Sequence, residues 1–236
     1  MEPDGDDSMN QFTRRGILGA MGTGLFGLAG CNMLSVPYFL FMAPEPKIEA
    51  EIGKVSSADK KKINKVLILT YMKLDLRPEF LQADREIAFY LEKHLKELTT
   101  ANKEKITIVS PRKVEDYKNQ HPDWQDKEVS DIGKHFKADA VVYIEVNSLS
   151  LYEQGSGGTL YRGKGDLTIS LVDVNHPDES RPPQPFSTSY PREAKMIFTP
   201  NDKSPAEFRA SFLEYLGRRI AWKFTARPTA DDFKAD

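Results

Sequence analysis

Residues 65–71 read KVLILTY, and this short run constrains the fold more than any other stretch of the chain. Its side chains are mostly apolar and several are β-branched, which is typical of a strand buried in a sheet. A buried strand needs neighbouring strands and covering elements. The remaining pattern of the chain shows which elements can supply them.

Helical and extended patterns alternate along the rest of the chain. Apolar residues recur at helical spacing over 78–98, where Pro78 suits the first position, and over 205–224, where Ser204 is an expected N-cap before Pro205. Shorter helices are expected at 114–119 and 130–136. Extended segments are expected at 106–109, 138–146, 159–174 and 186–198. This order predicts an α/β sandwich, a mixed β-sheet of about five strands packed with helices.

The composition excludes several classes of function. The net charge of -2 leaves no basic surplus for a nucleic-acid backbone. A single cysteine excludes a disulfide framework and a cysteine-rich metal site, and the four histidines show no metal-binding spacing. We therefore expect no metal, no cofactor, no nucleic-acid partner and no small-molecule substrate.

The N-terminal region has the layout of an export signal. Arg14 and Arg15 precede an uncharged, glycine-rich run that ends at Cys31. Leu28, Ala29, Gly30 and Cys31 resemble the lipobox of bacterial lipoproteins. That resemblance implies cleavage before Cys31 and a lipid on its sulfur. The paired arginines are similar to a twin-arginine export motif, although the Sec route stays open.

These features predict four segments of the chain. They are a signal peptide at 1–30, a lipidated N-terminus and tether at 31–62, an α/β domain at 63–225 and a flexible tail at 226–236. Residues 16–44 are also long enough to span a membrane as an uncleaved anchor. Met9 is a more ordinary start for a signal than the acidic residues before it. Lysines 60–62 are interpreted as a solvated end of the tether, and contact to anionic headgroups is the alternative.

The folded part resembles the periplasmic α/β domains of the TolB amino-terminal, CsgG and LpoB group. The resemblance lies in KVLILTY, in ITIVSPRKVEDYKNQ and in DIGKHFKADAVVYIEVNSLS. That group often has Gly-Ala-Asp in the third phrase, where this chain has Lys137 before Ala138 and Asp139. The resemblance implies a mostly non-catalytic protein that binds partner proteins or forms rings.

Three groups of residues are candidates for chemistry. The stretch GSGGT at 155–159 has the composition of a phosphate loop, but the strand that follows favours a hairpin tip. Glu145 and Asp173 could act as acid and base if they faced each other, although exposure to solvent or pairing with a basic neighbour is the favoured interpretation. His121 and His135 could meet in space, although surface histidines are the favoured interpretation.

Tyr152, Tyr161 and Tyr190 are a candidate partner surface, with cross-strand packing as the favoured alternative. A pore is disfavoured, because the strands around the hairpin lack long alternating apolar faces. The leading hypothesis is a non-catalytic, lipid-anchored envelope protein that binds a partner in an assembly, transport or cell-wall complex. It is expected outside the cytoplasm, with the outer membrane favoured. The alternatives are a CsgG-type ring- or pore-forming secretion lipoprotein and an envelope enzyme.

Overall fold

The structure is a computed structural model, and it describes residues 46–59, 61–72, 78–193 and 196–232. Residues 46–236 form one compact unit. Arg14, Arg15, Leu28, Ala29, Gly30 and Cys31, the residues of the predicted export signal and lipobox, lie outside the described residues. No helix in the described ranges is long and apolar enough to cross a membrane.

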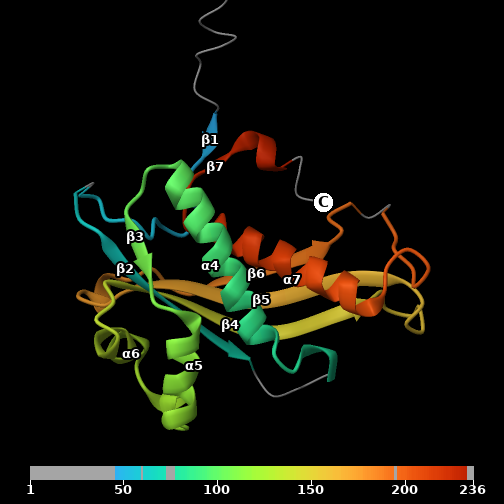
Figure 1. Cartoon of the computed structure of the whole chain (residues 1–236), viewed down its shortest axis with the longest axis horizontal. Helices are drawn as coiled ribbons and strands as arrows, with labels where there is room; N and C mark the ends of the chain where they lie inside the picture. The colour runs from blue at the N-terminus through green and yellow to red at the C-terminus, as the bar shows by residue number, and fades with distance from the viewer. Residues whose placement is uncertain (1–45, 60, 73–77, 194–195, 233–236) are drawn as a thin grey trace, which may run out of the picture. The chain divides into compact units, whose positions relative to one another are not determined.

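A mixed sheet of five strands organises the unit, in the order β3-β2-β4-β5-β6 (Figure 1). The strands β2, β3 and β4 are parallel, and β5 and β6 continue the sheet in antiparallel fashion. The strands of this sheet are β2 (Asn64–Met72), β3 (Ile106–Ile108), β4 (Ala140–Tyr152), β5 (Tyr161–Asp173) and β6 (Gln184–Tyr190). The predicted α/β fold with a mixed five-stranded sheet is confirmed.

Helices cover the two faces of the sheet unequally. The helices α4 (Ala83–Ala101) and α7 (Pro205–Ala221) pack against one face, and α5 (Pro111–Gln120) and α6 (Val129–His135) pack against the other. Single-turn 3-10 helices lie at η1 (Pro78–Phe80), η2 (Trp124–Asp126), η3 (Pro177–Glu179) and η4 (Thr229–Asp232). The predicted helix at 78–98 is thus a 3-10 turn followed by α4.

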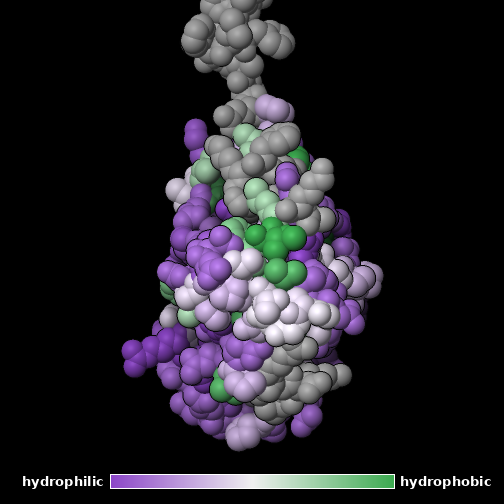
Figure 2. All heavy atoms as spheres, turned by 90° about the vertical axis from the view of Figure 1, so that its right-hand side faces the viewer, coloured by the Kyte–Doolittle hydropathy of each residue, from purple (hydrophilic) through white to green (hydrophobic). Residues whose placement is uncertain are grey.

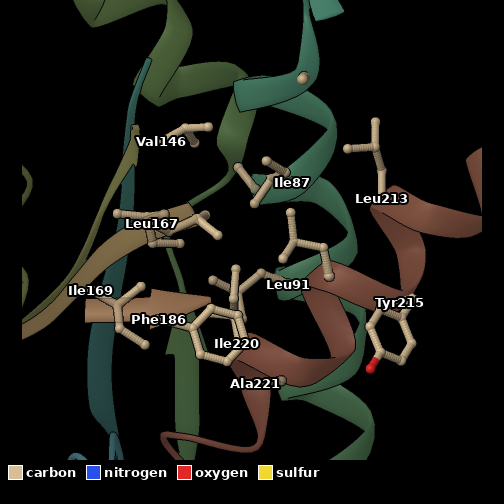
Figure 3. Close-up of a cluster of buried hydrophobic side chains, with 14 of the residues drawn as sticks. Ile87, Leu91, Val146, Leu167, Ile169, Phe186, Leu213, Tyr215, Ile220 and Ala221 are labelled. Atoms are coloured by element: carbon tan, nitrogen blue, oxygen red, sulfur yellow. The ribbon is translucent and has the colours of Figure 1, made fainter. Parts of the chain in front are cut away.

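The larger core lies between the sheet and the pair α4 and α7. Figure 3 shows Ile87 and Leu91 of α4 and Ile220 of α7 converging on Leu167 of β5 and Phe186 of β6. All five side chains are buried, four of them at 1% exposure or less. This packing explains the helical spacing of apolar residues over both helices.

Two features fix α4 against α7. Arg209 of α7 forms a bidentate ion pair with Glu86 of α4, with both N–O distances at 2.8 Å. At Gly217 the helices approach so closely that a Cβ atom would lie 2.6 Å from the Cβ of Tyr90. The predicted cap of α7 is confirmed, since Ser204 and Glu207 form a reciprocal capping box.

Three predicted boundaries need correction. Residues 46–59, expected to belong to the tether, pack on the domain, with Ile52 and Val55 almost completely buried. The segment after α7, expected as a tail from residue 226, forms β7 (Arg227–Pro228), which pairs with β1 (Lys47–Ile48). Strand β6 ends at Tyr190, so the expected extended segment 186–198 is shorter, although Phe198 still bridges to Tyr161.

Candidate functional site

Residues 46–59, which we call the strap, run along the segment that follows α7. The strap donates backbone hydrogen bonds from Ile52 to the carbonyl of Lys223 at 3.0 Å and from Val55 to that of Phe224 at 3.1 Å. At its first residue, the carbonyl of Pro46 accepts a hydrogen bond from the backbone of Thr229. The strap is therefore held by regular hydrogen bonds as well as by its two buried side chains.

The turn that follows α4 lies beside the strap. Asn102 connects the two, because its side-chain oxygen accepts a hydrogen bond from Lys47 at 2.6 Å. The amide nitrogen of the same side chain donates to the carbonyl of Ala226 at 2.6 Å and to Thr225 at 3.1 Å. One polar side chain thus joins the strap, the turn and the C-terminal segment.

A hollow of about 500 Å³ lies between the strap and this turn, and we call it the strap hollow. Four lysines and two carboxylates contribute to its lining: Lys54, Lys62, Lys103, Lys105, Asp59 and Glu104. Its other lining residues are uncharged and include Ser56 and Ser57. The lining therefore carries more positive than negative charge, whereas the whole chain is slightly acidic.

Two of the four lysines have acidic partners. Lys54 pairs with Glu49 at 2.7 Å, and the hydrogen bond to that carboxylate raises the pKa of the lysine. Lys62 pairs with Asp139 at 2.8 Å, which raises its pKa in the same way. Burial opposes ionisation of Asp139, but hydrogen bonds from Lys62 and from the backbone of Lys65 outweigh it and lower the pKa of Asp139.

The other two lysines have no such partner. Lys103 and Lys105 are exposed, and their side chains form no hydrogen bond or ion pair among the described residues. Lys103 has a φ of 58°, in the left-handed region that usually ends a helix with glycine. A lysine at this position carries a conformational cost that glycine would avoid.

The three tyrosines of the expected partner surface lie elsewhere, and two of them contradict that expectation. Tyr161 and Tyr190 are 2% and 7% exposed and belong to the core. Tyr152 lies opposite Tyr161 across β4 and β5, with ring centroids 5.6 Å apart. Cross-strand packing, the favoured alternative, is confirmed for this pair. Tyr161 and Tyr190 are buried in the core because their positions on the strands face α7.

The glycine-rich stretch is a hairpin tip. It joins the antiparallel strands β4 and β5, and Gly155, Gly157 and Gly158 all have positive φ values. Glu145 and Asp173 do not meet, because they lie opposite Thr168 and Ala140 on neighbouring strands. Neither the hairpin tip nor the pair of Glu145 and Asp173 therefore supplies a convergent set of reacting groups.

The histidines fall into different environments. His121 and His135 do come together, because both rings pack against Tyr117 and their own ring centroids lie 6.1 Å apart. His94 is buried on α4, with Nδ1 3.0 Å from a carboxylate oxygen of Glu97, and burial lowers its pKa. Across the described ranges, no group of three or more His, Cys, Asp or Glu side chains is placed to hold a metal ion.

The segment between β6 and α7 exposes apolar side chains, with Met196 and Ile197 at 45% and 57% exposure. Figure 2 shows a largely hydrophilic face with a small hydrophobic patch. Single exposed apolar residues of this kind are ordinary on protein surfaces. The strap hollow is the more distinctive feature of the described surface.

The strap hollow is difficult to predict from the sequence. Its lysines come from two stretches about forty positions apart, and only the fold brings the two stretches together. The run of lysines at 60–62 by itself favours a solvated end of the tether, with contact to anionic headgroups as the alternative, and does not indicate a hollow. The signal that could have been used is the positive charge directly after the last turn of the helix at 83–101.

No family model matches the chain, and no curated protein sequence matches it. Several solved structures are similar in shape. The PelC dodecamer from Paraburkholderia phytofirmans is 8% identical, with 78% of this chain and 99% of that chain covered and a TM-score of 0.39. Lipoprotein GNA1162 from Neisseria meningitidis is 16% identical, with 56% and 82% covered and a TM-score of 0.36.

A third similar structure is the hypothetical protein CT253 from Chlamydia trachomatis. It is 10% identical, with 68% of this chain and 96% of that chain covered and a TM-score of 0.41. At these identities and TM-scores, the likenesses assign neither a family nor a function to the chain.

Proposed function

We propose that this chain is a lipid-anchored protein of the bacterial cell envelope whose α/β domain binds a partner protein. The observation that carries the proposal is the stretch from Leu28 to Cys31, which follows Arg14, Arg15 and an uncharged run. The signal is cleaved before Cys31, and the lipid on the only cysteine of the chain anchors the protein. Two or more acyl chains make such anchoring stable.

The start of the folded unit supports this arrangement. Residues 32–45 separate Cys31 from Pro46, the first residue of the compact unit. A fully extended segment of this length reaches about 50 Å. The domain is therefore kept close to the membrane while retaining freedom to meet a partner.

A binding role is also supported by the residues that were candidates for chemistry. The glycine-rich stretch forms a hairpin tip, and Glu145 and Asp173 lie on separate parts of the sheet. A pair of reacting groups that faced each other at either place would instead favour an enzyme. The proposed role is therefore non-catalytic.

Metabolic labelling with a radioactive fatty acid tests the anchor. The full chain should incorporate label and sediment with membranes, and Cys31→Ser should lose the label and the membrane association together. The mass of the mature chain should correspond to residues 31–236 plus lipid. An unlabelled chain that retains residues 1–30 would refute lipid anchoring and favour the uncleaved membrane anchor.

Affinity purification from crosslinked envelopes tests the partner. A second protein that copurifies reproducibly with the full chain, identified by mass spectrometry, supports the binding role. A large complex that contains only this chain would contradict it and favour the ring- or pore-forming alternative.

A further inference from the structure

We propose that the strap hollow binds the phosphate group of an anionic phospholipid, so that this end of the domain lies against the membrane surface. The inference rests on the proposed lipid anchor, because the anchor brings the hollow near a bilayer. It adds a second, electrostatic contact and an orientation that the anchor alone does not provide.

The charge of the strap hollow fits an anion. Lys103 and Lys105 are exposed and unpaired within the described part of the chain. The two carboxylates of the lining are engaged within the chain. Glu104 accepts a hydrogen bond from Thr225 at 3.1 Å, and Asp59 accepts one from the backbone of Lys61 at 2.9 Å. Both carboxylates keep their negative charge, so an anion in the hollow would be held by Lys103 and Lys105, whose ammonium groups have no acidic partner among the described residues.

The position of the hollow on the chain favours a lipid over a soluble phosphate compound. The strap follows directly from residue 45, and Lys47 of β1 is hydrogen bonded to Asn102 of the turn that lines the hollow. Figure 1 shows the last turn of α4 beside β1, the first strand of the compact unit. The segment that connects to the lipid therefore begins next to the lysines.

Each lysine near an anionic surface increases membrane partitioning about fivefold. Replacing Lys103 and Lys105 together should thus weaken binding about 25-fold. The loss should be smaller at physiological salt, because salt screens the charges. The side chains are exposed, so Lys103→Gln with Lys105→Gln should leave the fold intact. Lys103→Arg with Lys105→Arg should preserve binding, because it keeps both charges.

The test uses the full chain with Cys31→Ser, which carries no lipid, and vesicles of phosphatidylcholine with or without phosphatidylglycerol. Flotation should show binding that needs phosphatidylglycerol and falls about 25-fold in the double glutamine variant. The matched control is Arg112→Gln with Lys113→Gln, at the start of α5 beyond the opposite end of β3. Both of these residues are exposed and form no side-chain hydrogen bond or ion pair in the described ranges.

Three outcomes would overturn the proposal. They are equal binding to both kinds of vesicle, an equal loss in the two double variants, and a rise in Tm with inorganic phosphate that is lost in the double glutamine variant while the chain shows no preference for anionic vesicles. The last result would assign the hollow to a soluble phosphate compound. Since every variant shares the same N-terminal segment and lacks lipid, failure here leaves the labelling test of Cys31 unaffected.

Discussion

Gly217 lies where α7 meets α4. Its replacement by alanine has two effects of known size, and these effects change the stability in opposite directions. In an isolated helix, glycine is less favourable than alanine by about 1 kcal/mol, so Gly217→Ala would be expected to stabilise α7. In this structure the new Cβ would lie 2.6 Å from the Cβ of Tyr90 and 3.0 Å from the backbone nitrogen of Leu91. The outcome depends on which effect is larger.

The atoms that the new methyl group meets cannot rotate away, because they belong to or adjoin the backbone of α4. Carbon atoms in contact prefer separations of about 3.5–4.0 Å, so the helices must move apart by about 1 Å. Overpacking of this kind costs about 1–3 kcal/mol, and backbone contacts place Gly217 near the upper end. After the gain in helix propensity, the free energy of unfolding should fall by about 2 kcal/mol.

Thermal unfolding followed by circular dichroism measures this difference. For a domain of this size, 2 kcal/mol corresponds to a decrease in Tm of about 4–8 °C. Ser211→Ala on the same helix is the control, because it replaces a partly exposed side chain and should change stability by at most about 0.5 kcal/mol. A Tm for Gly217→Ala that equals or exceeds the wild-type value would refute the close approach of the two helices.

Three further changes test other parts of the fold. Lys137 has a φ of 52° and an exposed side chain, so Lys137→Gly should raise the free energy of unfolding by about 0.5–1 kcal/mol in urea titration, and a decrease would contradict the left-handed backbone. Ser204→Ala should lower the Tm by about 2–4 °C through loss of the capping box with Glu207, whereas an unchanged Tm would argue against the cap. Burial lowers the pKa of His94, so the unfolded chain binds more protons below about pH 6.5 and stability should fall as the pH decreases through that value. His94→Gln should reduce this pH dependence in unfolding measured at several pH values, and an identical dependence would assign it to other groups.

The elements that the sequence predicts well are those with a strong pattern of their own. The apolar run at 65–71 lies within β2, and the spacing over 205–224 contains α7 together with its cap. Local signals suffice for these elements because each one buries a continuous face of its own. The hairpin tip at 155–159 is equally local, since its glycines are required by positive φ values.

The strap and the partner surface could not be predicted in the same way. Within residues 46–59 only Ile52 and Val55 have side chains in the apolar core, which is too sparse for a periodic signal. Their backbone partners follow α7 and are far away in the sequence. Tyr161 and Tyr190 are buried by contacts with α7, a tertiary effect that no short pattern of the strands reveals.

The pairing of the strap with the end of the domain has a consequence for biosynthesis. The ribosome makes the strap before any of the other described residues, whereas its hydrogen-bonding partners at 223–229 are made only after the strands and helices from β2 to α7. Until those residues emerge, Ile52 and Val55 have neither their backbone partners nor a completed core. The domain therefore cannot complete its fold on the ribosome while its C-terminal residues are still in the exit tunnel. In a chain that is truncated before residue 223, the strap would permanently lack its backbone hydrogen-bonding partners.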